Sequence, residues 1–147
     1  MWLYKKKKIK EISQFPKDTF GFIYKVTHNP SGKIYFGRKN LFHNRKQKLS
    51  KRAISLIDGP GRKPKYKVVT KESDWQTYYG SNKTVQNLIK EGKENEFSRQ
   101  ILKFCSSKKL LTYYEAKFLF MNEVLENPDK YFNDNILGKF YTKDLVS

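Results

Sequence analysis

The chain has a single cysteine, Cys105, among its 147 residues, which excludes an internal disulfide. Its neighbours are apolar, so we expect a small buried hydrophobe there and not a nucleophile. No segment approaches the roughly 20 consecutive apolar residues that cross a bilayer. The lysine-rich start also lacks the apolar stretch of a secretory signal. These absences predict a cytoplasmic protein with no membrane partner.

Residues that bind zinc are scarce as well. The two histidines, His28 and His43, are too few and too badly placed for a histidine-based metal cage. The sequence has no internal repeat, no zinc-ligand spacing and no glycine-rich loop that could cradle a phosphate. Enzyme classes that depend on those features are therefore disfavoured.

Acidic residues are few compared with basic ones. Fourteen Asp and Glu stand against 31 Lys and Arg, which gives a formal net charge of +17 and a pI near 9.9. Such an excess favours a polyanionic partner, because each neutralised phosphate releases condensed counterions. A basic surface that only aids solubility is the alternative. Charge alone indicates a polyanion and does not indicate a nuclease.

The remaining composition suits one folded domain, since 37% of the residues are hydrophobic and 16% aromatic. Residues 1–17 are lysine-rich with little apolar pattern, and we expect a basic arm, partly disordered or lying on DNA. β-branched and aromatic residues predict strands over 20–26 and 33–37. The Pro and Gly between them predict a tight turn, so the two strands should form a hairpin.

Downstream of the hairpin the pattern predicts further helices, a loop and one more strand. A basic helix is expected over 40–57, and an exposed loop rich in Pro and Gly over 58–65. The other expected elements are a helix over 81–91 capped by Ser81, a strand over 96–104, a helix from Ser106 or Ser107 to Glu126, and a tail over 131–147 that packs back on the domain.

The hairpin resembles the GIY-YIG nuclease superfamily. Phe22-Ile23-Tyr24 and Tyr35-Phe36-Gly37 stand where that superfamily has its GIY and YIG tripeptides, and Phe22 replaces the first glycine. Tyr79-Gly80-Ser81, Glu96-Phe97 and Glu115 follow in a similar order and spacing. The segment Asp74-Trp75 to Ser81 is especially similar to small phage-encoded (seg-like) members.

The resemblance implies an α+β fold in which a three-stranded antiparallel sheet, the hairpin plus a third strand, is flanked by helices. Residues 18–147 would form one nuclease domain with a basic loop insertion near 58–74. The implied activity is that of an endodeoxyribonuclease of phage or mobile-element type, which cuts double-stranded DNA with Mg²⁺ or Mn²⁺. A phage enzyme would act in the host cytoplasm. The sequence leaves monomer and homodimer open.

Two tyrosines and a set of cations are the expected catalytic residues. The resemblance assigns Tyr24 and Tyr35 to orienting or deprotonating the attacking water and to contacting the phosphate. A free tyrosine has a pKa near 10, so a base role would require cations nearby. Basic residues follow in the sequence, and they would clamp the phosphate. The first candidates are Arg38 and Arg45, and the possible alternatives are Lys39 and His43.

Glu115 lies among aromatic residues on the long predicted helix, where an ionised carboxylate needs compensation. The resemblance makes it the metal ligand, and Mg²⁺ commonly takes one or two carboxylates. The alternative is an ion pair with Lys108 or Lys117. Asn133 resembles the late asparagine that orders the family's site, and Asn135 is a weaker alternative.

Basic residues of the 58–71 region are the expected DNA contacts, because Pro and Gly should expose them to solvent. They are Arg62, Lys63, Lys65 and Lys67. Two other functions stay open at this point. One is a DNA-binding module without catalysis, and the other is a basic RNA-binding protein.

Overall fold

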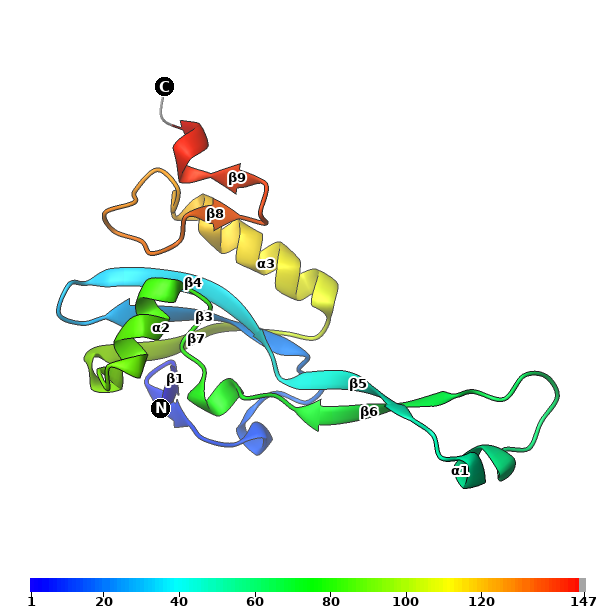
Figure 1. Ribbon diagram of the computed structural model, residues 1–147. Coiled ribbons are helices and arrows are strands. Elements are labelled where there is room, and N and C mark those ends of the chain that lie inside the picture. Colours follow the sequence, from blue (N-terminus) through cyan, green and yellow to red (C-terminus); the bar gives the residue numbers. More distant parts are fainter. Residues whose placement is uncertain (146–147) are drawn as a thin grey trace. The chain divides into compact units, whose positions relative to one another are not determined.

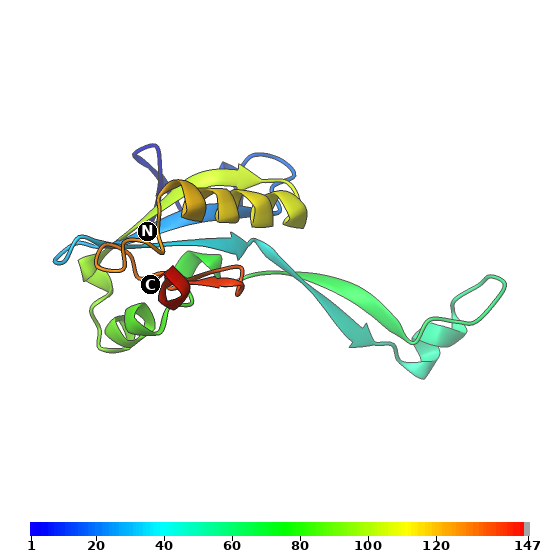
Figure 2. The ribbon, with the colours of Figure 1, turned by 90° about the horizontal axis from the view of Figure 1, so that it is seen from above.

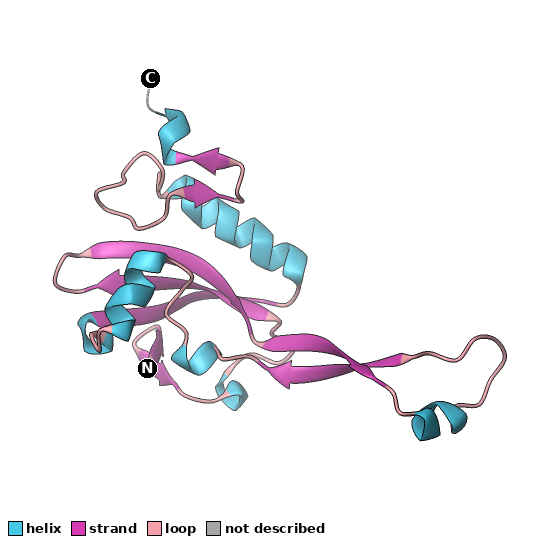
Figure 3. Ribbon diagram, viewed as in Figure 1, coloured by secondary structure: helices cyan, strands magenta, loops and turns pink. Residues whose placement is uncertain are grey.

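The computed structural model describes residues 1–145, and the chain divides into two compact units. The first unit comprises Met1–Leu41 and Asp74–Ser147, and the second is Phe42–Ser73. Figure 1 labels their elements and Figure 3 separates helices from strands by colour. Within the described residues no helix is long and apolar enough to cross a membrane.

The first unit is built on a five-stranded mixed sheet in the order β2-β1-β7-β3-β4. Its strands are β1 (Trp2–Tyr4), β2 (Lys7–Ile9), β3 (Gly21–His28), β4 (Lys33–Asn40) and β7 (Phe97–Cys105). Strand β1 runs parallel to β7, and the other neighbours are antiparallel. The α+β class is therefore confirmed. The expected three-stranded sheet is too small, because β1 and β2 extend it beyond β7.

The expectation of a partly disordered N-terminal arm over 1–17 was wrong, because β1 and β2 belong to the sheet. The side chain of Trp2 is buried in the main core, and its indole N–H donates to the carbonyl of Trp75 over 2.7 Å. The lysines around it face solvent. A lysine-rich composition therefore hid two short strands whose few apolar side chains complete the core.

The predicted hairpin is confirmed as β3 and β4, joined by the turn 29–32. Gly32 closes this turn with a positive φ of 73°, and its N–H donates to the carbonyl of His28. Strand β4 lies at the edge of the sheet. The tail covers that edge through two backbone hydrogen bonds. The N–H of Phe132 donates to the carbonyl of Ile34, and the N–H of Ile34 donates to the carbonyl of Lys130.

Helices cover both faces of this sheet. Helix α3 (Lys108–Met121) begins after its N-cap Ser107 and packs on β3 and β4, as Figure 2 shows from above. Helix α2 (Lys83–Lys90) and a 3₁₀ turn over Trp75–Thr77 pack on the opposite face, through Val85 and Trp75. Asn82, not Ser81, caps α2, and Gly92 follows the helix with a positive φ of 79°.

The tail forms a small hairpin of its own. Its strands are β8 (Asn135–Ile136) and β9 (Phe140–Tyr141), and a 3₁₀ turn over Thr142–Leu145 follows. Ile136 is buried with Leu119 and Leu125 in a second core cluster on the α3 side. The expected return of the tail onto the domain is therefore confirmed.

The second unit contains an antiparallel ribbon of β5 (Phe42–Lys48) and β6 (Tyr66–Glu72), with the short helix α1 (Lys51–Ser55) between them. The basic helix expected over 40–57 was therefore wrong over Phe42–Lys48, which pair with β6, and only Lys51–Ser55 of that range form an α-helix. The exposed loop over 58–65 is confirmed. Residues 66–72 of the expected loop insertion are a strand instead.

Candidate active site

The two tyrosines of the hairpin lie on the same face of the sheet. Tyr24 is paired with Gly37, and Tyr35 is two residues away from Gly37 on β4, so the two side chains are diagonal neighbours. Their ring centroids are 6.2 Å apart. A Cβ on Gly37 would lie 2.6 Å from Cζ of Tyr24. Glycine is required here because the Tyr24 ring lies across the backbone of β4.

The loop before α2 covers these rings. Gly80 has a φ of 111°, and a Cβ there would approach the Tyr35 ring to 3.0 Å and the Tyr24 hydroxyl to 3.3 Å. The hydroxyl of Tyr35 lies 2.9 Å from Oγ of Ser81. Tyr78 packs edge-to-face on Tyr24, at 5.9 Å between centroids. This loop therefore holds the Tyr35 hydroxyl through Ser81 and packs against the Tyr24 hydroxyl at Gly80.

Both phenols resist ionisation in this setting. Burial raises the pKa of Tyr24 well above 10, and the neighbouring Tyr35 and Tyr78 raise it further. Burial also raises the pKa of Tyr35, although its hydrogen bond with Ser81 lowers it in part. Glu115 raises both pKa values through its negative charge. A phenolate base would need cations that lower its pKa, and no cation is among the causes of either shift. Both tyrosines are therefore neutral hydrogen-bonding groups.

Arg38 and Glu115 lie on the opposite, α3-covered face of the sheet. Arg38 is paired with Ile23, whose side chain is buried against α3. Its Nε lies 4.0 Å from Oε2 of Glu115, and its guanidinium donates to Oγ1 of Thr112, one turn earlier on α3. Glu115 thus pairs with Arg38, and not with the lysines considered from the sequence.

The pKa of Glu115 shows that this pairing compensates its charge only in part. Burial raises the pKa above its ordinary 4.5, while the charge and the backbone N–H of Arg38 lower it. The net shift is upward, so a further cation would stabilise the ionised carboxylate. That is the behaviour expected of a carboxylate that faces a ligand site.

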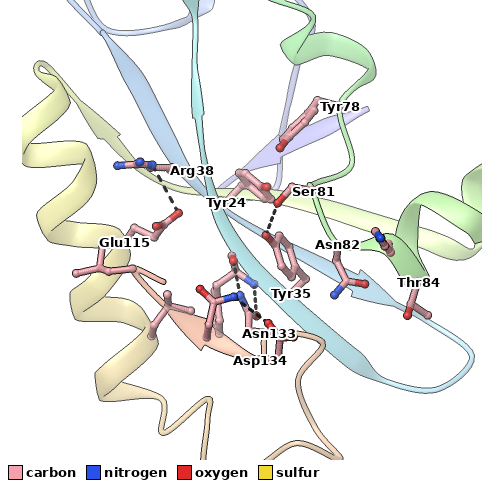
Figure 4. Close-up of a pocket in the computed structure, with 15 residues that line it drawn as sticks. Tyr24, Tyr35, Arg38, Tyr78, Ser81, Asn82, Thr84, Glu115, Asn133 and Asp134 are labelled. Atoms are coloured by element: carbon pink, nitrogen blue, oxygen red, sulfur yellow. Dashed lines mark hydrogen bonds and ion pairs between the residues drawn. The ribbon is translucent and has the colours of Figure 1, made fainter. Parts of the chain in front are cut away.

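One pocket of about 780 Å³ joins these two groups around β4, the edge strand of the sheet. Figure 4 shows the tyrosines on one side and Glu115 with Arg38 on the other. The first turn of α2 contributes Lys83 and Thr84 to the same pocket. All residues that line it belong to the first unit: Tyr24, Tyr35, Phe36, Arg38, Tyr78, Ser81, Asn82, Lys83, Thr84, Glu115, Leu119, Asn133, Asp134, Asn135 and Leu137.

Asn133 holds the tail against the middle of β4. Its Oδ1 accepts from the backbone N–H of Phe36 over 3.0 Å, and its Nδ2 donates to the carbonyl of the same residue over 2.8 Å. Its side chain is buried, and the residue lies between Tyr35 and Glu115 in the pocket wall. Asn133 therefore joins the tail to the backbone of β4. Asn135 also lines the pocket, but it is exposed and bonds to Gly138 and Asp134.

A magnesium site would have to rest on few protein ligands. Over residues 1–145, no group of three or more His, Cys, Asp or Glu side chains could hold an ion. Mg²⁺ tolerates this, since it usually keeps several waters and takes one or two carboxylates plus substrate phosphate. Glu115 fits, because it is a partly compensated carboxylate in a polar pocket with room for water and phosphate.

Three cations predicted for the site lie outside the pocket lining. Lys39 follows Arg38 on β4 but lies on the tyrosine face, where its Nζ is 2.5 Å from Oδ1 of Asp74 and 3.9 Å from the Tyr78 ring centre. His43 and Arg45 belong to β5 in the second unit. The four predicted DNA contacts also belong to that unit, three in the loop and Lys67 on β6.

Sequence reasoning missed several residues of the pocket. Ser81 was interpreted only as a helix cap, although Tyr79-Gly80-Ser81 belongs to the motif that carried the resemblance. Asp134 lies close enough to Tyr35 to raise its pKa. Its position next to Asn133 was the signal available. Lys83 and Thr84 carried no signal beyond their place after a predicted cap.

Comparison with protein families gives one match. The model described as "Putative endonuclease segE, GIY-YIG domain" matches residues 2–136. No curated protein and no solved structure gives a significant match. The matched span starts with the first residue of β1, which agrees with the place of that strand in the sheet, and it ends with the last residue of β8. It includes all fifteen pocket residues except Leu137. The chain therefore belongs to the segE-type GIY-YIG family of nucleases.

Proposed function

We propose that the protein is a metal-dependent endonuclease that hydrolyses phosphodiester bonds of double-stranded DNA in the pocket around β4. Family membership supports a nuclease, and the net charge of +17 supports a nucleic-acid substrate. The observation that carries the proposal is the meeting of a tyrosine pair with an Arg38–Glu115 pair in one pocket.

Substrate binding would use the positive groups of the pocket. The first turn of α2 presents the positive end of the helix dipole, which favours a phosphate. Lys83 adds a charge at the same place. Arg38 would clamp the scissile phosphate from the other side of β4 and would stabilise the charge that develops on its oxygens.

The tyrosines would act as neutral groups, because burial raises both pKa values. A neutral Tyr35 hydroxyl can donate to a phosphate oxygen and can orient a water, while Ser81 fixes its direction. The more deeply buried Tyr24 would position Tyr35 and donate at the pocket floor. This proposal replaces the phenolate base considered from the sequence.

Glu115 would hold a Mg²⁺ or Mn²⁺ ion. The ion would supply Lewis-acid stabilisation of the phosphoryl oxygens. The ion's charge would also lower the pKa of the Glu115 carboxylate, since an opposite charge favours the ionised form. Arg38 keeps Glu115 in place in the absence of an ion.

The exposed cations of the loop and β6 would contact the DNA, and those of the loop would bind the phosphates of its backbone. They are Arg62, Lys63 and Lys65 in the loop and Lys67 on β6. Neutralising one phosphate-binding cation should make the slope of log K against log salt less steep by about 0.9. Action in a host cytoplasm, as part of a phage or mobile element, remains a proposal from the resemblance.

The direct test is incubation of the purified protein with supercoiled plasmid and Mg²⁺, with and without a chelator. We expect nicked or linear DNA only when the metal is available. Duplex binding without cleavage under any metal would indicate a DNA-binding module. Stronger binding to single-stranded RNA than to duplex DNA at equal salt would indicate an RNA-binding protein.

A further inference from the structure

The second unit, Phe42–Ser73, carries a charge excess that its structure does not explain. It contains ten of the chain's 31 basic residues and two acidic ones, Asp58 and Glu72. In β5 every residue is exposed, and in β6 all but one are. A two-stranded ribbon with no buried face is marginal in water. The ribbon therefore has the composition and exposure of a surface that binds a polyanion.

The dimensions of the ribbon fit one particular polyanion. Two paired strands lie about 4.8 Å apart, and the major groove of B-DNA is about 12 Å wide and admits a two-stranded ribbon. Seven continuous cross-strand pairs join β5 to β6. At about 3.4 Å per residue, they span about 20 Å, or about six base pairs.

The register divides the ribbon into two different faces. One face, which we call the readout face, has no acidic residue and consists of His43, Arg45, Gln47, Lys67, Val69 and Lys71. The opposite face includes Glu72, which would repel phosphates. It also includes Asn44 and Thr70, whose side chains bond to each other over 3.0 Å. The readout face is thus the better surface for DNA.

The side chains of the readout face match the chemistry of base edges in the major groove. Arg and Lys donate to O6 and N7 of guanine, and Gln pairs with N6 and N7 of adenine. Val69, paired with Arg45, offers an apolar contact to a thymine methyl group. The other face offers Lys46 and Lys48, which suit phosphates better.

We infer that the readout face of the β5–β6 ribbon enters the major groove of duplex DNA and gives the enzyme a sequence preference of about six base pairs. This inference rests on the proposed function only in taking duplex DNA as the substrate. It gives His43 and Arg45 a role in base recognition instead of catalysis. Specificity then needs no separate recognition domain.

The test compares two double variants of the full-length protein that lose the same charge from opposite faces of the ribbon. Arg45→Ala with Lys67→Ala changes the readout face, and Lys46→Ala with Lys48→Ala changes the other. Each protein is used to select duplexes from a randomised pool, in chelator so that no cleavage occurs, and the bound DNA is sequenced. Gln47→Ala is a third variant that leaves the charge unchanged.

The wild type should enrich a motif of about six base pairs. The readout-face pair should lose discrimination at one or more positions by at least about fivefold, as expected when a side chain that reads a base edge is removed. Gln47→Ala should relax one position without altering the salt slope. The Lys46/Lys48 pair should keep the motif and bind more weakly at every sequence.

Absence of any enriched motif would overturn the inference, and so would equal effects of the two double variants on the motif. Because selection takes place without metal, its outcome is independent of cleavage. A protein that cleaves plasmid DNA but enriches no motif would refute only the inference. One that enriches the motif but never cleaves would refute only the proposed function.

Discussion

Replacing Asn133 by alanine should destabilise the protein by removing the link between the tail and β4. The side chain is 8% exposed, and it satisfies both the N–H and the carbonyl of Phe36. Each buried backbone group left without a partner costs about 1–3 kcal/mol. Water can reach an edge strand once the side chain is gone, so we expect a loss of about 2–4 kcal/mol in the free energy of unfolding.

Urea denaturation of Asn133→Ala measures this loss, with Asn135→Ala as the matched control. Asn135 lies two residues away and lines the same pocket, but it is exposed, so its loss should cost less than about 1 kcal/mol. Equal midpoints for the wild type and Asn133→Ala would refute the reasoning. A variant of full stability that had lost activity would show that Asn133 contacts the substrate instead.

Three further predictions concern the centre of the pocket. Gly37→Ala should lower the free energy of unfolding by about 1–3 kcal/mol through overpacking, which urea denaturation measures. It should also reduce the rate of plasmid cleavage, because the new Cβ displaces the Tyr24 ring. The Mg²⁺ concentration that gives half-maximal cleavage should increase as pH is lowered toward the pKa of metal-free Glu115, which burial raises above 4.5, because the protonated carboxyl must lose its proton to bind the ion, and a Mg²⁺ requirement independent of pH would contradict this. A carboxyl group whose pKa is raised by folding contributes to stability below pH 4.5. This contribution is lost as pH rises through the raised pKa, because the ionised carboxylate is less well accommodated in the folded protein. Glu115→Gln should therefore raise the free energy of unfolding at neutral pH, and an equal or lower value in urea denaturation would count against the burial argument.

The hairpin and its tyrosines could be predicted because their signals are local. Strand-forming residues on both sides of a Pro-Ser-Gly turn specify β3 and β4, and the period of two places Tyr24 and Tyr35 on one face. Helix α3 was predictable from its stripe of apolar residues and from a serine cap, which is Ser107, although it ends at Met121 and not at Glu126. Composition and spacing were sufficient for these elements.

The elements that sequence reasoning missed depend on distant pairing. Strand β5 is basic and has one apolar residue, Phe42, so its own sequence has no strand pattern and only its pairing with β6 makes it a strand. Trp2 enters the core only because β1 pairs with β7, far along the chain. The pocket also depends on the pairing of distant segments. The tyrosines and Glu115 lie on opposite faces of the sheet and share a pocket only around the edge strand β4.

The single-turnover rate of plasmid cleavage in Mg²⁺ by Glu115→Gln, compared with the wild type, tests the proposed active site most directly. Glu126→Gln is the control, because it removes the same charge from an exposed position outside the pocket lining. We expect Glu115→Gln to be folded and slower by at least about 100-fold, with Glu126→Gln close to the wild type. Cleavage by Glu115→Gln at the wild-type rate would contradict the assignment of this pocket as the active site.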